Sequence, residues 1–290
     1  MNRTLLEIPI PFLDWHIPIY SYGFMLMMGF LFGLLVVRRK ARAEGLDPDL
    51  MTDLCLYILL AGVLGGRLLF VIHHFGDYAG NPLEILKVFK GGLSFYGGFF
   101  AATTTAAVFC KKKGLPALKV LDMAAVGLAL GMVFGRIGCF LNGCCYGDRA
   151  QEGFLFAVQF PKTKDALGNV DGSPAFLHHL EEGWVGFADP FSLPVHPTQL
   201  YSSLGDFFLF LALSALYSYK KRDGEMVLLF CIFYAPMRFI LEILRDDSTP
   251  VLYGLTLSQV ISIPVFLLAL GLFIYERRGL KKAGLEKKGA

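Results

Sequence analysis

Long segments with almost no charge are the feature that most constrains the fold of this chain. Residues 20–37 and 93–110 contain no Asp, Glu, Lys or Arg. A helix on a soluble protein needs a polar face toward water, and these segments supply none. About 20 apolar residues allow a helix to cross a bilayer. The sequence therefore predicts an all-α membrane protein with about seven transmembrane helices, near 20–37, 54–72, 93–110, 121–138, 200–219, 226–241 and 251–275.

The overall composition agrees with a membrane protein. Of the 290 residues, 55% are hydrophobic and only 18% are charged, whereas soluble domains carry about 25% charged residues. The net charge of +3 is too small to indicate a nucleic-acid partner. The N-terminal segment lacks the basic region, apolar run and small-residue cleavage site of a signal peptide, so we expect the first span to be retained.

The positions of Lys and Arg predict the orientation in the membrane. A basic cluster follows the first, third, fifth and seventh segments. Cytoplasmic loops are enriched in Lys and Arg, so this alternation predicts seven crossings, an outside N-terminus and a cytoplasmic C-terminus. The clusters are Arg38, Arg39, Lys40 and Arg42; Lys111, Lys112 and Lys113; Lys220, Lys221 and Arg222; and Arg277, Arg278, Lys281 and Lys282.

Two segments on the predicted outer side are longer than turns. Residues 73–92 enclose a short amphipathic stretch, 82–89, which we expect to lie along the membrane interface. Residues 143–197 form the longest polar stretch, and its turn-rich, alternating pattern predicts a small extracytoplasmic head with some β-structure. We therefore expect a single membrane domain, 1–290, into which this head is inserted.

Ionisable residues inside membrane spans are costly and thereby indicate function. Arg67, Arg136 and Arg238 lie near the predicted outer ends of three spans, and Glu242 follows Arg238 by one helical turn, where the two can pair. A single arginine in such a place is often explained by its side chain reaching the headgroups. Three of them favour binding of phosphate, and hence of a phospholipid. Other polar residues predicted on this side are Tyr22, Tyr96, His196, Gln199, Asp206 and Arg245.

The segment GMVFGRIGCFLNGCCYGD, at 131–148, is the most distinctive local motif. Its glycines allow tight turns and close approach of the backbone, and Asn142 can meet polar ligand atoms. Gly127 and Gly131 are equally explained by helix packing. Three readings exist for its cysteines: a disulfide, a metal site, and ordinary packing residues. The spacing lacks paired CxxC motifs and a matched histidine, so we expect packing residues and no metal. These cysteines are Cys139, Cys144 and Cys145.

Five motifs together resemble the bacterial prolipoprotein diacylglyceryl transferase family. They are YGFM at 22–25, GGLSFYGG at 91–98, GRIGCFLNGCCYG at 135–147, HPTQLY at 196–201 and YAPMRFILEILRDD at 234–247. The resemblance implies seven transmembrane helices with an extracytoplasmic head. It also implies a multi-pass enzyme of the bacterial cytoplasmic (inner) membrane, with its active site on the extracytoplasmic side and no cofactor. Its partners would be phosphatidylglycerol, membrane lipids and the lipobox cysteine of a prolipoprotein signal peptide.

The resemblance also implies roles for single residues. Arg136 matches the signature arginine that holds the phospholipid headgroup. Arg238 matches an essential arginine, and Glu242 matches its acidic partner. Tyr22 matches a tyrosine of the first helix. The remaining residues that we expect to bind substrate are Asn142, Gly147, Tyr234, His196, Gln199 and Arg245.

The chain departs from the best-known members at three positions. It has Tyr96 where they carry histidine, and Cys139 and Cys144 where they carry Asn and Glu. A neutral phenol is a poor proton acceptor, so we expect Tyr96 to orient substrate or relay a proton, and the leaving phosphate to accept it. With Arg136 and Arg238, it completes the predicted catalytic set.

Three other classes of protein share some of these features. A transporter would place charges near the midplane and contain repeats, but the charges here lie at one side. An intramembrane protease would carry a motif such as GxSxG or HExxH, which this sequence lacks. A non-catalytic lipid-binding protein would share the arginines without the thiol chemistry.

Overall fold

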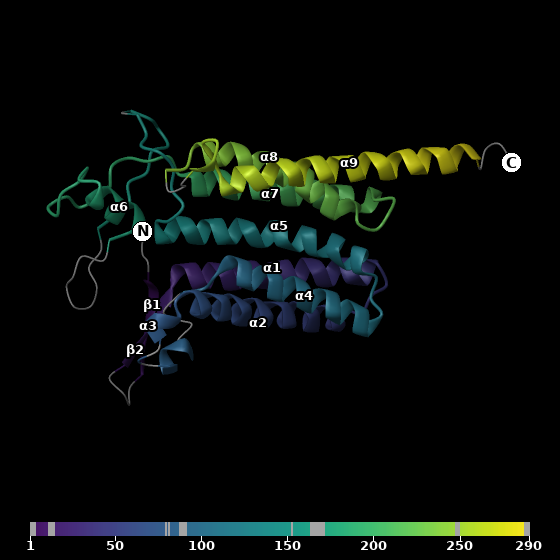
Figure 1. The fold of residues 1–290 in the computed structure, drawn as a ribbon, viewed down its shortest axis with the longest axis horizontal. Helices are drawn as coiled ribbons and strands as arrows, with labels where there is room; N and C mark the ends of the chain where they lie inside the picture. The colour runs from purple at the N-terminus through teal and green to yellow at the C-terminus, as the bar shows by residue number, and fades with distance from the viewer. Residues whose placement is uncertain are drawn as a thin grey trace. The chain divides into compact units, whose positions relative to one another are not determined.

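The computed structural model describes residues 4–10, 15–78, 80, 82–86, 92–151, 153–162, 172–246 and 250–286. Long helices dominate it, as Figure 1 shows. The long helices are α1 (Ser21–Ala43), α2 (Pro48–His73), α4 (Phe95–Lys113), α5 (Ala117–Asn142), α7 (Thr198–Leu216), α8 (Glu225–Ile243) and α9 (Leu257–Glu286). The short elements are β1 (Thr4–Ile10), β2 (Trp15–Tyr20), α3 (Phe75–Tyr78), η1 (Pro82–Leu86), α6 (Pro174–Glu181), η3 (Tyr217–Tyr219), β3 (Pro250–Leu252) and β4 (Leu255–Thr256).

Six of the described helices are long and apolar enough to cross a membrane: α1, α2, α5, α7 together with η3, α8 and α9 up to Gly279. The third predicted span also forms a helix, α4, but Gly97, Gly98, three threonines and three lysines lower its hydropathy. An all-α multi-pass membrane protein is therefore confirmed.

The chain divides into two compact units. The α2–α4 unit comprises residues 34–124, and the α5–α9 unit comprises residues 1–33 and 125–290. In the α2–α4 unit, α2 packs against α4 through glycines. A Cβ atom on Gly65 would lie 2.6 Å from the Gly97 carbonyl oxygen. This approach leaves no room for a side chain and holds the two helices together.

The α5–α9 unit carries most of the predicted site residues. The first half of α1 packs on α5 through small residues, and a Cβ atom on Gly29 would lie 2.8 Å from the Gly131 carbonyl oxygen. Gly33 meets Gly127 in the same way, so the helix-packing interpretation of Gly127 and Gly131 is confirmed. On α7, Ser203 Oγ donates a hydrogen bond of 3.1 Å to the Val133 carbonyl of α5. Helix α8 in turn packs against both α7 and α9.

Several predicted boundaries were wrong. The seventh span begins at Leu257 rather than at 251, because residues 250–256 form the β3–β4 hairpin. Tyr253 and Gly254 have φ of 48° and 78° and make the tight turn of this hairpin. Residues 4–20, for which no structure was predicted, contain the β1–β2 hairpin.

The two polar segments on the predicted outer side are only partly regular. The 82–89 stretch is described only as far as η1, and its remaining residues lie outside the described part. In the described part of 143–197, the β-structure consists of isolated bridges, such as Val158 with Val195 and Arg149 with Val195. Helix α6 packs among them, capped by the Ser173 side chain. The hydrophobic core of the 143–197 segment includes Tyr146, Phe160 and Ala175, all of which are buried.

Candidate functional site

The predicted pair on α8 is present and is well supported. Arg238 Nη2 lies 2.7 Å from Glu242 Oε2, four residues along the helix. Glu242 is buried, and its Oε1 accepts a hydrogen bond of 3.0 Å from Thr256 Oγ1 of β4. Arg238 also donates to Ser258 Oγ on α9, at 3.0 Å. The guanidinium is therefore fixed by contacts on α8 and α9, while β4 holds its buried acidic partner in place.

Arg136 of α5 joins this pair from a second helix. It interacts electrostatically with Arg238, with Tyr234 of α8 and with Asp206 of α7. The Asp206 side chain is only 1% exposed. Neither of its carboxylate oxygens has a hydrogen-bond partner within the described residues. The acidic side chain therefore lies near two guanidinium groups without occupying them through hydrogen bonds within the described residues.

One nitrogen of the site is free to bind a ligand. Arg238 Nη1 is buried and has no hydrogen-bond partner among the residues that the structure describes. Buried donors of this kind are costly unless they are satisfied. Arg245, just beyond α8, lies 3.9 Å from the same Glu242 carboxylate and adds a third positive group. The site can therefore accept an anion.

Tyr22, at the start of α1, borders this site. Its ring packs on Gly138 of α5, where a Cβ atom would lie only 3.0 Å from Tyr22 Cδ2. Its hydroxyl is an electrostatic neighbour of Arg136 and of the cysteines. The side chain remains 39% exposed. Glycine at 138 thus lets the α1 tyrosine lie directly over the arginine helix.

The loop after α5 is held by the first residues of α7. Gly143 has φ of 76° and ends the helix. Gln199 is fully buried and donates through Nε2 to the Cys144 carbonyl at 2.8 Å. Thr198 Oγ1 donates to the Cys145 carbonyl, also at 2.8 Å. The Gln199 side chain therefore holds the backbone of this loop in place.

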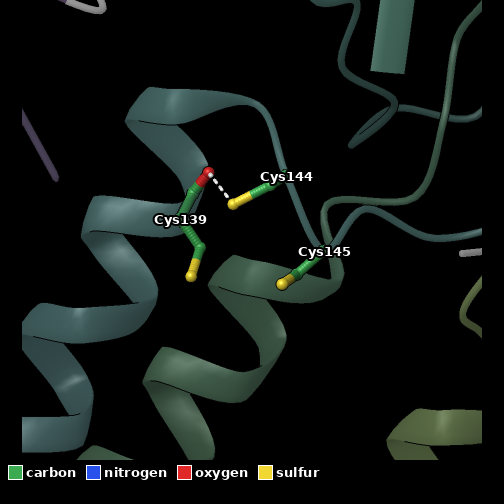
Figure 2. A group of neighbouring side chains, drawn as sticks. All are labelled: Cys139, Cys144 and Cys145. Atoms are coloured by element: carbon green, nitrogen blue, oxygen red, sulfur yellow. Dashed lines mark hydrogen bonds between the residues drawn. The ribbon is translucent and has the colours of Figure 1, made fainter. Parts of the chain in front are cut away.

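Cys139 at the end of α5 and two cysteines of this loop lie near the arginines. The Cys144 Sγ–H donates to the Cys139 carbonyl oxygen at 3.7 Å, as Figure 2 shows. The neighbouring thiols lower the pKa of Cys145, and the guanidinium groups of Arg245 and Arg136 add to this effect. Asn142, the last residue of α5, lies within hydrogen-bonding reach of Cys144.

Gly147 has a packing role. A Cβ atom there would lie 2.5 Å from the Leu244 carbonyl oxygen and 2.7 Å from Thr198 Cγ2. Its N–H donates to the His196 carbonyl at 2.9 Å, and it forms a β-bridge with Arg245. Gly147 therefore joins the loop, α7 and the end of α8.

His196 faces the head. Its ring lies 4.7 Å from the Phe154 ring, centre to centre. Both line an open cavity of about 440 Å³, together with Asp148, Arg149, Gln151, Gly153 and Leu244. Its predicted contact with substrate stays a prediction.

Two residues singled out from the sequence lie in the other unit. Arg67, 7% exposed, donates from Nε, Nη1 and Nη2 to the carbonyls of Ile85, Gly92 and Glu84, at 2.8–3.0 Å. All three guanidinium nitrogens therefore hold the loop after α2. The expectation that Arg67 acts with the other two arginines on phosphate stays a prediction. Tyr96 is 44% exposed on the first turn of α4 and contacts the Phe95 ring edge-on.

Thr256 and Ser258, which brace the α8 pair, were missed by the sequence analysis. Both lie in a segment that was assigned to the seventh span, so their hydroxyls were not considered. Asp206 was recognised as an intramembrane acid but was given no role. Only the packing of α7 against α5 and α8 reveals that it faces the arginines.

The fold and site define an α-helical, multi-pass membrane protein with a cluster of half-buried arginines and buried acidic side chains. A family model described as prolipoprotein diacylglyceryl transferase matches residues 10–275. A Clostridium tetani protein named phosphatidylglycerol–prolipoprotein diacylglyceryl transferase is 32% identical over 267 residues, covering 92% of this chain and 96% of the relative. Its namesake from Bacillus licheniformis is 31% identical over 278 residues, 96% of each chain. The chain belongs to the prolipoprotein diacylglyceryl transferase family and is a transferase.

Proposed function

We propose that this enzyme moves the diacylglyceryl group of phosphatidylglycerol onto the lipobox cysteine of a prolipoprotein signal peptide. The product is a thioether, and glycerol phosphate is released. The names of the relatives specify phosphatidylglycerol and a prolipoprotein as their substrates. This reaction is the first step in attaching a lipid anchor to the prolipoprotein.

The observation that carries the proposal is Arg238 Nη1, which lies near Arg136 and has no hydrogen-bond partner in the part of the chain that the structure describes. A phosphodiester offers two anionic oxygens, and a planar guanidinium can bind both. Because Glu242 and Ser258 fix Arg238 on its other nitrogen, the guanidinium is preorganised for the headgroup. Preorganised donors stabilise charge best where it develops in the transition state.

The chemistry is one displacement. The cysteine sulfur forms a bond to C3 of the diacylglyceryl group, while the C3–O bond to phosphate breaks and its electron pair stays on the phosphate oxygen. Arg136 and Arg238 stabilise that charge. The thiol proton passes to the leaving phosphate, with the Tyr96 hydroxyl as relay. No metal or cofactor is needed in this scheme.

The other predicted site residues support binding in this proposal. Tyr22 and Tyr234 lie near Arg136 and offer hydroxyl groups to the headgroup. Asn142, beside Cys144, offers an amide. His196 faces the head, where the signal peptide would approach. Gln199 and Gly147 act through the backbone that they position, and Arg245 braces Glu242.

We further propose the topology that the charge pattern indicates. The membrane domain, 1–290, crosses the bacterial inner membrane seven times, with α4 included, and its C-terminus is cytoplasmic. Residues 143–197 form the extracytoplasmic head. The clusters after α4 and α7 support this orientation, because both would meet the cytoplasmic surface.

A reconstitution assay tests the function. Purified protein is incubated with phosphatidylglycerol and a prolipoprotein, and the gel mobility of the prolipoprotein is followed. We expect a shift that requires the enzyme, phosphatidylglycerol and the substrate cysteine. Phosphatidylethanolamine in place of phosphatidylglycerol serves as the lipid control. A shift that survives replacement of the substrate cysteine by serine would contradict the proposal.

A further inference from the structure

Three cysteine thiols converge where α5 ends, beside Arg136. The sulfur atoms of Cys139, Cys144 and Cys145 all lie within 4.8 Å of one another, and Figure 2 shows the three side chains directed into one space. Three thiolates bound to one metal ion at about 2.3 Å are about 3.8–4.0 Å apart. Small side-chain rotations therefore bring all three sulfurs within bonding distance of a single ion.

An unusual backbone makes this convergence feasible. Successive residues of an extended chain point to opposite sides, so adjacent cysteines seldom share one site. Cys145 has φ of 59°, a left-handed conformation that costs about 1–2 kcal/mol for a residue with a Cβ atom. The hydrogen bonds from Thr198 and Gln199 to the Cys145 and Cys144 carbonyls hold it there. Strain that is held in this way is typical of functional sites.

Cysteine binds a metal ion as the thiolate, and positive side chains lie close to the cluster. Arg136 is a neighbour of Cys139 and Cys145, and Arg245 is a neighbour of Cys145. All three cysteines are free thiols of intermediate exposure, so an ion can reach them. Thiolates are soft ligands and select thiophilic ions over Mg²⁺ or Ca²⁺.

A second group of potential ligands, in the head, does not share this chemistry. His178, His179 and Asp246 also lie close together. However, His179 Nδ1 accepts a hydrogen bond of 3.1 Å from the Leu193 N–H. The proton of the neutral ring is therefore on Nε2, and that nitrogen has no lone pair to offer a metal. The cysteine group is thus the better candidate.

We propose that Cys139, Cys144 and Cys145 together bind one thiophilic d¹⁰ metal ion. Each thiol loses its proton to solvent as its sulfur bonds to the ion. Three thiolates alone suit Cu(I), and Zn²⁺ would complete a tetrahedron with water. The sequence spacing argued against a metal, but spacing does not reveal the left-handed turn at Cys145. Binding of the ion requires neither lipid nor prolipoprotein, so it is measured apart from the transfer reaction.

Metal titration of the reduced, full-length protein in detergent tests this site. Cu(I) and Zn²⁺ are added in separate anaerobic arms, and bound metal and released protons are measured after desalting. We expect one ion per chain in at least one arm, with up to about three protons released. C139S, C144S and C145S should each lose the bound ion on desalting. Gln199→Ala should weaken binding about 10–100-fold, because it frees the loop that orients two ligands.

The remaining cysteines provide the matched control. A variant with Cys55, Cys110 and Cys231 replaced by Ala keeps the cluster and should bind one ion as before. The proposal would be overturned if C139S, C144S and C145S bound as much metal as the parent protein. It would also be overturned if the parent retained neither Cu(I) nor Zn²⁺. A disulfide within the cluster combined with no metal uptake after reduction would overturn it as well. Transfer activity is measured separately, so a failure of the proposed reaction leaves this result interpretable.

Discussion

The Arg238 guanidinium lies 2.7 Å from the Glu242 carboxylate and keeps a second nitrogen, Nη1, free of hydrogen bonds to any described residue. One side of the group is thus anchored and the other is available. Nη2 therefore fixes the orientation of the group, and Nη1 can bind a ligand. A lone arginine that only reaches toward the headgroups would not divide its nitrogens in this way. This arrangement predicts that a positive charge alone at position 238 is insufficient for the transfer reaction.

Replacing Arg238 tests this prediction. Arg238→Ala should lower kcat about 10²–10³-fold, because it removes a donor to the leaving phosphate. Arg238→Lys should restore little, since an ammonium cannot bind Glu242 and phosphate through separate arms of one planar group. Initial rates of the mobility shift measure both variants. Arg39→Lys, an exposed position, is the control, and normal turnover by Arg238→Lys would refute the geometry.

Substitution of Arg67 should lower stability and leave kcat nearly unchanged, the opposite of what we expect at Arg238. The three nitrogens of Arg67 hold three loop carbonyls, and lysine can satisfy only part of this set. We expect Arg67→Lys to lower the free energy of unfolding by about 3 kcal/mol. Thermal unfolding in detergent measures this loss. At temperatures where the variant is folded, kcat should stay close to that of the parent enzyme. A large drop in kcat there would show that Arg67 acts on the phosphate together with Arg136 and Arg238.

The contrast between these two arginines shows what the sequence could and could not predict. Hydropathy located the helices because each span is a long local signal. The Arg238–Glu242 pair was predictable because both residues lie on one helix. The role of Arg67 depends on a loop up to 25 residues away that returns to it. No local pattern encodes that contact.

The predicted boundaries of the membrane spans were wrong where apolar character did not mark the helix end. The segment before α9 is as apolar as a span, but Tyr253 and Gly254 adopt positive φ and turn the chain into a hairpin. The start of α2 was placed too late because its first turn is polar. Asp47 caps that turn through Asp49 N–H, and Pro48 follows the cap. This signal was present in the sequence and was not used.

Gly147 should tolerate no side chain. In Gly147→Ala, the new Cβ atom would meet the Leu244 carbonyl oxygen at 2.5 Å and Thr198 Cγ2 at 2.7 Å. We expect a loss of about 1–3 kcal/mol in the free energy of unfolding, together with lower activity, because the loop that carries the cysteines shifts. Gly271→Ala, where nothing lies within 4 Å, is the matched control and should be neutral or slightly stabilising. Equal melting temperatures for the two variants would contradict this account.

Tyr96 offers a test of proton transfer. Its side chain is 44% exposed, so Tyr96→Phe should leave thermal stability unchanged. If the hydroxyl relays the thiol proton, kcat should fall about 10²-fold. Tyr275→Phe, at a 76% exposed tyrosine, should have no effect. Unchanged turnover in Tyr96→Phe would show that the hydroxyl takes no part in the proton transfer.

The head should lose stability in acid through His179. Burial lowers the pKa of this imidazole, the neighbouring His178 and Arg149 act in the same direction, and Asp246 opposes them. The unfolded chain therefore binds a proton below about pH 6.5, whereas the folded head resists it. The stability that the neutral ring contributes is present above that pH and is lost as the pH falls toward the lower folded pKa. Melting temperatures between about pH 8 and pH 5.5 measure this slope.

His179→Asn should flatten that dependence on pH. An amide oxygen can accept the Leu193 N–H in place of Nδ1, and an amide does not titrate in this range. The variant should therefore melt at a similar temperature to the parent at pH 8 and at a higher one at pH 5.5. His73→Asn, at an exposed histidine on α2, should retain the parent slope. If both variants keep that slope, the acid sensitivity arises elsewhere, and burial of the neutral His179 ring does not control it.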